Sequence, residues 1–206
     1  MKKKIILYSL FIVVLVGVYL LALTDIKGYF KVELPRLGYV QPFSFIDQDG
    51  DSVTSKDVNH KVYVAEYFFT TCTGICPKMN ANMALVYNKF KDSADFAIIS
   101  HTSMPETDSI PLLKAYEEKM IGNNTNNPAR WYFVTGDKAN LYKMARESYL
   151  VDDPNNNSEN IDDSFIHTQF FSLVDQQGRV RGIYDGLKKD EIQLLEKDIA
   201  KLLKKE

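Results

Sequence analysis

Cysteine is scarce in this sequence: among 206 residues only Cys72 and Cys76 carry a thiol. Two cysteines with three residues between them cannot staple distant parts of a fold, which excludes the disulfide-rich scaffolds of small secreted domains. Strong charge of one sign is also missing, because the net charge is −2 and lysines cluster only at the two ends. The sequence therefore does not indicate a nucleic-acid-binding protein. Internal repeats are absent too, and the length fits one ordinary domain with an extension.

Charged residues are absent from Ile5 to Leu23, directly after the lysines of Lys2–Lys4. As a helix this run would span roughly 28 Å, close to the thickness of a bilayer's hydrocarbon core. It has no small-residue cleavage pattern and no following cysteine for lipid attachment. We therefore expect residues 1–24 to be an uncleaved membrane anchor and residues 25–40 a linker, with a cleaved signal peptide as the alternative. The lysines should stay in the cytoplasm, which places the rest of the chain on the periplasmic side of a bacterial inner membrane.

Strand and helix patterns alternate over residues 41–206. The expected order is a hairpin, three strand–helix pairs, a second hairpin and a final amphipathic helix. The strands are expected at Val62–Phe69, Phe96–Ile99 and Trp131–Val134, and the helices that follow them begin near Pro77, Pro111 and Lys138. The two hairpins turn at Asp47–Gly50 and Asp175–Gly178. The last helix carries one apolar stripe, formed by Ile192, Leu195, Ile199 and Leu202. An acidic segment, residues 151–163, has no such pattern and is expected to be a functional or disordered loop. This order predicts an α/β fold with a mixed sheet and helices on both faces.

The cysteine pair lies between the first buried strand and the helix that follows it. A thioredoxin-like fold has its active site at this place. Pro77 suits the first turn of a helix, so we expect the helix to begin after Cys76 and the pair to lie in a loop. The partial positive charge at the helix N-terminus favours thiolate, which is the form that attacks disulfides and binds metals. The pair therefore predicts redox chemistry, metal binding, or both.

The chain has three histidines that could add a third donor. We expect His60 to be exposed in a turn, and His101 to follow the second strand at an edge where catalytic groups often gather. His167, between the acidic loop and the strand Gln169–Val174, is the favoured donor. Two thiolates and an imidazole are an incomplete set for structural zinc, which prefers four ligands. Because soft thiolates select Cu(I) and imidazole suits copper, copper is the favoured metal and zinc the alternative.

Two simpler explanations concern the sulfur-bearing side chains. The cysteines could be incidental buried residues, but thiol chemistry usually explains pairs of this kind. Met79 and Met83 could offer further soft sulfur, yet their helical spacing with Val86 favours core packing.

With these motifs in view, the chain resembles the Sco/SenC family of copper chaperones. The resemblance runs from about Leu34 to the last helix. It rests on the strand followed by Cys72–Pro77, on His167 before a strand and an Asp-x-x-Gly turn ending at Gly178, and on the segment Trp131–Gly136. The N-terminal anchor fits as well.

The resemblance implies a thioredoxin-like domain over residues 41–206 that binds Cu(I) or Cu(II) through Cys72, Cys76 and His167. It implies a membrane-anchored metallochaperone that assists assembly of the CuA site of cytochrome c oxidase, by delivering copper or by reducing the CuA cysteines. The partners would be the oxidase subunit that carries CuA and a thiol reductant of the cell envelope. Many members have an Asp between the cysteines, where this chain has Thr73–Ile75, and a Val-Asp-Pro-like segment where it has His101–Pro105. The resemblance therefore specifies the copper-binding residues more closely than it specifies the client oxidase.

Two other functions stay open from the sequence. A thiol–disulfide oxidoreductase of the cell envelope needs only Cys72 and Cys76 as a redox-active pair and leaves His167 structural. A copper- or redox-sensing interaction protein would use residues 151–163 as a partner surface or lid.

Overall fold

The chain divides into two compact units, Met1–Leu34 and Pro35–Glu206. The computed structural model describes residues 2–29, 33–122, 127–152 and 168–204. The first unit contains helix α1 (Lys2–Tyr29), whose stretch Lys3–Leu21 is long and apolar enough to cross a membrane. The large apolar side chains from Ile5 to Leu21 are exposed. The apolar N-terminal helix expected from the sequence is thus confirmed, and its length and composition suit a membrane span or a signal sequence.

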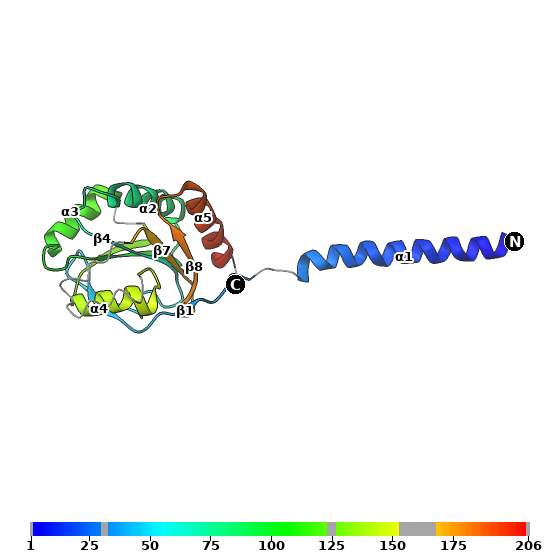
Figure 1. Ribbon diagram of the computed structural model, residues 1–206, viewed down its shortest axis with the longest axis horizontal. Coiled ribbons are helices and arrows are strands. Elements are labelled where there is room, and N and C mark those ends of the chain that lie inside the picture. Colours follow the sequence, from blue (N-terminus) through cyan, green and yellow to red (C-terminus); the bar gives the residue numbers. More distant parts are fainter. Residues whose placement is uncertain (1, 30–32, 123–126, 153–167, 205–206) are drawn as a thin grey trace. The chain divides into compact units, whose positions relative to one another are not determined.

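The second unit is built around a six-stranded mixed sheet in the order β1-β8-β7-β4-β5-β6 (Figure 1). The strands are β1 (Gly38–Tyr39), β4 (Val62–Phe68), β5 (Phe96–Thr102), β6 (Arg130–Val134), β7 (Phe170–Val174) and β8 (Arg179–Asp185). Strand β4 is parallel to β5, and β5 to β6, whereas β7, β8 and β1 add antiparallel pairs on the other side of β4. Every residue of β4 and β5 is buried, as a nearly continuous apolar run predicts for a central strand.

Helices cover both faces of this sheet, as the alternating pattern predicts (Figure 1). Helices α2 (Cys76–Phe90), α3 (Ile110–Ile121) and α5 (Lys189–Leu203) lie on one face. Helix α4 (Lys138–Lys143), continued by the π-helical turn η1 (Met144–Ser148), lies on the other. The α5 stripe of Ile192, Leu195, Ile199 and Leu202 is buried as expected.

A small separate sheet, β2 (Ser44–Ile46) and β3 (Ser52–Thr54), is the first predicted hairpin. Gly50 takes a φ of 85° in its turn, a conformation that glycine adopts without strain. The buried Gln48 side chain joins the hairpin to α3 and to the main sheet, because its Nε2 donates to Glu117 Oε1 of α3 at 2.7 Å and its Oε1 accepts from the Phe133 N–H of β6 at 2.8 Å. The hairpin is therefore part of the domain core.

Two details differ from the sequence expectations. Residues 25–40 were expected to be a linker, whereas Gly38 and Tyr39 form β1 against β8, a strand too short to leave a pattern. The helix expected from Lys138 to about Glu147 changes to π-helical geometry at Met144. The acidic loop, residues 151–163, falls almost wholly outside the described residues, so the expectation about it stays a prediction.

Candidate metal and redox site

The two cysteines lie between the carboxyl end of β4 and the first turn of α2. Residues 69–75 connect the two elements and form the cysteine loop. Within it, the Cys72 N–H donates to the Phe69 carbonyl at 3.2 Å in a turn, and Cys76 is the first residue of the helix. Both thiols therefore sit at the carboxyl edge of a parallel strand pair, where open α/β sheets bind their ligands.

The start of α2 corrects one prediction. The helix was expected to begin after Cys76, but it begins at Cys76, with Ile75 at the N-cap and Pro77 in the first turn. Proline is tolerated throughout the first turn, because the N–H that it lacks has no helical partner there. Consequently Cys76 is fixed by the helix, whereas Cys72 belongs to the loop.

The two thiols differ in environment. Neither forms a disulfide, and Cys72 is half-buried whereas Cys76 is buried. Burial raises the pKa of the Cys76 thiol far above its ordinary value, and its interaction with the Cys72 side chain raises it further, although the Phe69 N–H that donates to the sulfur opposes this. Burial thus outweighs the helix N-terminus, from which a stabilised thiolate was expected. Attack on a disulfide or binding of a metal by Cys76 must release this proton.

A buried carboxyl group, Glu66, lies in β4 six residues before Cys72. Ser100 donates to its Oε1 at 2.5 Å, and Trp131 Nε1 donates to the same serine hydroxyl at 2.8 Å. Its Oε2 has no hydrogen-bond partner among the described residues. Burial raises the pKa of Glu66 to about 8, and the Ser100 bond offsets only part of that rise. Glu66 was not among the predicted site residues, although a single acid inside an apolar strand was a visible signal.

A second buried carboxylate, Asp108, joins the cysteine loop to the end of β5. Its oxygens accept from the Thr70 N–H at 3.2 Å, from the Thr70 hydroxyl at 2.5 Å and from the Thr102 hydroxyl. Asp108 and Thr102 are fully buried. No sequence pattern indicates the contact between Thr70 and Asp108, because the two residues lie 38 positions apart in the chain.

The histidines divide between two environments. His60 is exposed in a turn, as predicted. His101, expected at the edge after β5, instead lies inside β5 and is fully buried, with its ring 4.9 Å from that of Tyr67 and 5.4 Å from that of Phe45. Burial lowers the pKa of His101 to about 3, so the imidazole is neutral. The expected edge position was wrong because the strand continues three residues beyond its apolar run.

The expected ligand His167 lies outside the described residues. Within the described ranges, no group of three or more His, Cys, Asp or Glu side chains is arranged to hold a metal ion. Met79 and Met83 are fully buried in α2, which supports their assignment to the core. The described part of the candidate site is therefore the cysteine pair alone.

Comparison with known proteins decides the family. Residues 33–204 match SCO1/SenC. This chain belongs to the SCO1/SenC family. The SCO1 protein homolog of Bacillus subtilis (strain 168) is 33% identical over 152 residues, which cover 72% of this chain and 74% of that protein.

Solved structures support the same conclusion. A SCO1/SenC family lipoprotein from Bacillus anthracis str. Ames is 30% identical, with a TM-score of 0.69 over 84% of this chain and 99% of that one. BsSco, described with a disulfide switch and as a member of the Sco family of cytochrome c oxidase assembly proteins, is 30% identical, with a TM-score of 0.65 over 84% of this chain and 98% of that one. ScoI of Bradyrhizobium japonicum, solved with copper bound, shares the fold at 22% identity and a TM-score of 0.60, over 80% of this chain and 99% of that one. The predicted thioredoxin-like fold is thereby confirmed.

The cysteine loop of this SCO1/SenC chain has space for a larger side chain between the two cysteines, where the resemblance to the family leads us to expect a carboxylate. Gly74 is exposed, and a Cβ added there would meet nothing within 4 Å. Packing therefore does not require a glycine at position 74. A carboxylate side chain would fit there, so its absence changes the chemistry of the loop and is not forced by lack of space.

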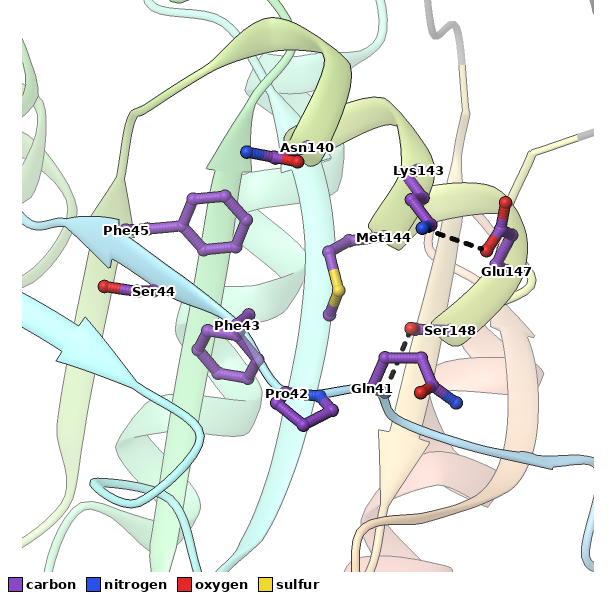
Figure 2. Close-up of a pocket in the computed structure, with 10 residues that line it drawn as sticks. All are labelled: Gln41, Pro42, Phe43, Ser44, Phe45, Asn140, Lys143, Met144, Glu147 and Ser148. Carbon is purple, nitrogen blue, oxygen red and sulfur yellow. Dashed lines mark hydrogen bonds and ion pairs between the residues drawn. The ribbon is translucent and has the colours of Figure 1, made fainter.

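A hollow of about 570 Å³ opens between residues 41–45 and helices α4 and η1 (Figure 2). Phe43, Phe45 and Met144 are among its apolar lining residues. At its polar side, Lys143 Nζ lies 3.9 Å from Glu147 Oε2. Neither cysteine lines it. In this SCO1/SenC chain the hollow is thus separate from the thiols.

Proposed function

We propose that this protein is a membrane-anchored copper metallochaperone that binds copper through Cys72, Cys76 and His167 and assists assembly of the CuA site of cytochrome c oxidase. The observation that carries the proposal is a pair of free thiols at the carboxyl edge of β4, in a fold shared with proteins solved with copper bound. Thiolates are soft donors, and a third, imidazole donor suits either oxidation state of copper.

Copper would compete with protons for the thiols at this site. Because the pKa of the Cys76 thiol is raised by burial, copper binding releases a proton there and is expected to strengthen as the pH rises. Cys72 is half-buried and lies in the loop, so it is the ligand that an incoming partner could reach first. This difference supports a transfer role, in which copper must leave as well as bind.

The proposal also covers location and partners. Residues 1–24 would anchor the chain in a bacterial inner membrane, residues 25–40 would serve largely as a tether, and residues 41–206 would work on the periplasmic side. The partners would be the oxidase subunit that carries CuA and a thiol reductant of the envelope. The apolar stretch Lys3–Leu21 of α1 and the BsSco relative support this arrangement.

Competition for Cu(I) against a chromophoric chelator tests the ligand set, with the full chain held in detergent. We expect Cys72→Ser and His167→Ala each to weaken copper binding by at least about tenfold, or 1.4 kcal/mol. His60→Ala is the matched control, because this histidine is exposed in a turn, and it should bind as the unmodified chain does. If His167→Ala binds copper as tightly as the unmodified chain, the three-ligand site is wrong.

A thiol–disulfide oxidoreductase is the second candidate. It is favoured by the interaction of the two cysteine side chains with each other and by the disulfide switch described for BsSco. In that case Cys72 and Cys76 would cycle between dithiol and disulfide with a client, and the chelator would strip copper from every variant equally.

A further inference from the structure

Asp108 is a carboxylate buried at the carboxyl edge of the sheet, beside the strand ends that carry the cysteine loop. Its exposed fraction is 0%. The donors that reach it are neutral, namely two threonine hydroxyls and one backbone amide. A buried carboxylate costs free energy unless hydrogen bonds replace its lost hydration. Four such contacts converge here, which indicates that the geometry of this edge depends on the residue.

These contacts join three segments. Thr70, which donates through both its N–H and its hydroxyl, is the second residue of the cysteine loop. Thr102 is the last residue of β5, and its hydroxyl donates to Asp108 and accepts from the Met104 N–H at 2.9 Å. The Asp108 N–H in turn donates to the Met104 carbonyl at 2.9 Å. The carboxylate therefore closes a compact turn and holds the loop against it.

The same edge is also held by backbone bonds. The Ser103 N–H donates to the Phe68 carbonyl at 2.7 Å, which joins the end of β4 to the residue after β5. Two residues beyond Thr70 the chain reaches Cys72, whose own N–H bonds back to Phe69. The path from the Asp108 carboxylate to the Cys72 thiol is thus short, and it runs through Thr70, which has two groups that donate to the carboxylate.

We propose that Asp108 is a positioning residue for the cysteine pair, acting through Thr70 to set where Cys72 stands relative to Cys76. A disulfide needs the two Cα atoms within about 4.4–6.8 Å and a restricted dihedral angle, so a shift of the loop by about an ångström changes how readily the pair closes. Cys76 is fixed by α2, and so the position of Cys72 decides the effective concentration of one thiol at the other. The inference rests on the proposed function in one respect only, that the pair is the working site.

The experiment is a thiol–disulfide equilibrium of the full chain in detergent against glutathione, read by alkylation and mass. Asp108→Asn puts an amide N–H₂ donor where two hydroxyls and an N–H already donate. We expect it to lower the equilibrium constant for closing the Cys72–Cys76 disulfide by about tenfold, equivalent to about 30 mV for a two-electron couple. Thr70→Val and Thr102→Val each remove one hydroxyl and leave the carboxylate, and each should lower the constant about threefold.

Two control variants separate positioning from general effects. Glu106→Gln removes a charge two residues away, on an exposed side chain paired with Lys138 at 2.6 Å. Tyr142→Phe removes a buried hydrogen bond to the Ser103 carbonyl of the same turn, at 2.9 Å, and so weakens the turn without touching Asp108. Both should leave the disulfide equilibrium within twofold of the unmodified chain.

An Asp108→Asn equilibrium within twofold of the unmodified chain overturns the proposal. If that variant does not fold, the two threonine variants decide, and unchanged constants in both overturn it equally. Because this readout needs no copper, it stays decisive even where His167→Ala shows the three-ligand copper site to be wrong.

Discussion

Glu66 shows how one buried side chain can make the stability of the whole domain depend on pH. Its pKa in the folded state is about 8, above its ordinary value of about 4.3. Between these two values the folded chain keeps a proton that the unfolded chain has released. The free energy of unfolding therefore falls as the pH rises from about 4.3 to about 8, by up to about 1.4 kcal/mol per pH unit from this residue.

Replacing Glu66 by Gln should remove this dependence. The Gln amide oxygen can still accept from Ser100 but carries no proton to lose, so the variant should gain stability over the unmodified chain at pH 8 and little at pH 5. Urea unfolding of the reduced, metal-free chain, followed by the fluorescence of the single tryptophan Trp131, measures both. Glu118→Gln, at an exposed position of α3, is the control. If the free energy of unfolding changes with pH by the same amount in the Glu66→Gln and Glu118→Gln variants, the raised pKa of Glu66 is wrong.

Among single residues, some site positions could be predicted from the sequence and others only from the structure. Cys72 and Cys76 were predictable because a thiol pair at a strand–helix junction carries its chemistry in its spacing. Asp108 was not predictable, because its role depends on Thr70 and Thr102, which only the parallel pairing of β4 and β5 brings near it. His101 was misplaced because an apolar run of four residues does not show how far a strand continues.

Among the elements, the hairpin of β7 and β8 depends on a buried ion pair. Arg181 Nη1 lies 2.7 Å from Asp175 Oδ2, and both side chains are 2% exposed. Burial alone would raise the pKa of Asp175, but Arg179 and Arg181 hold it below its ordinary value. Arg181 Nε also donates to the Pro35 carbonyl at 2.8 Å. One side chain thus joins the hairpin turn to the first residue of the domain.

Arg181→Met should destabilise the domain by about 3 kcal/mol, because it removes a buried positive charge from the buried Asp175 carboxylate, which keeps the partly exposed Arg179 and two backbone N–H donors. Adding Asp175→Asn to that variant should restore part of the loss, since no buried charge is then left. Lys188→Met is the control: this lysine pairs with Asp185 at 3.3 Å but is 64% exposed, and exposed pairs contribute about 1 kcal/mol or less. Urea midpoints rank the three variants, and an Arg181→Met midpoint equal to that of Lys188→Met would contradict the argument.

The elements also show the limit of pattern reading. Both hairpins, the central strands and the amphipathic α5 followed from periodicity and turn residues. Strand β1 did not, because Gly38 and Tyr39 are too few to show a period, and the π-helical end of α4 did not, because apolar spacing hardly distinguishes an α-turn from a π-turn.

For the whole molecule, the boundary of the folded domain is the testable question. A chain that begins at Pro35 keeps the bond from Arg181 and the whole of β1. A chain that begins at Gln41 loses both, together with the bonds from the Leu37 N–H to the Val180 carbonyl and from the Val40 N–H to the Gly178 carbonyl, each 2.9 Å. We expect the first truncation to fold as a soluble domain and the second to unfold at a clearly lower urea concentration. Equal midpoints would show that β1 is dispensable and that the linker extends to residue 40.

The order of the sheet has a consequence for how the protein is made. Strand β4 pairs with β5, about 34 residues downstream, and with β7, about 110 residues downstream. Because a chain emerges from its N-terminus, the thiols appear early and can gain one neighbouring strand while the other is still unmade. His167 comes only a few residues before β7 in the sequence. The second neighbour of β4 and the last proposed ligand are therefore made together, so the proposed three-ligand copper site cannot form on a chain that ends before β7.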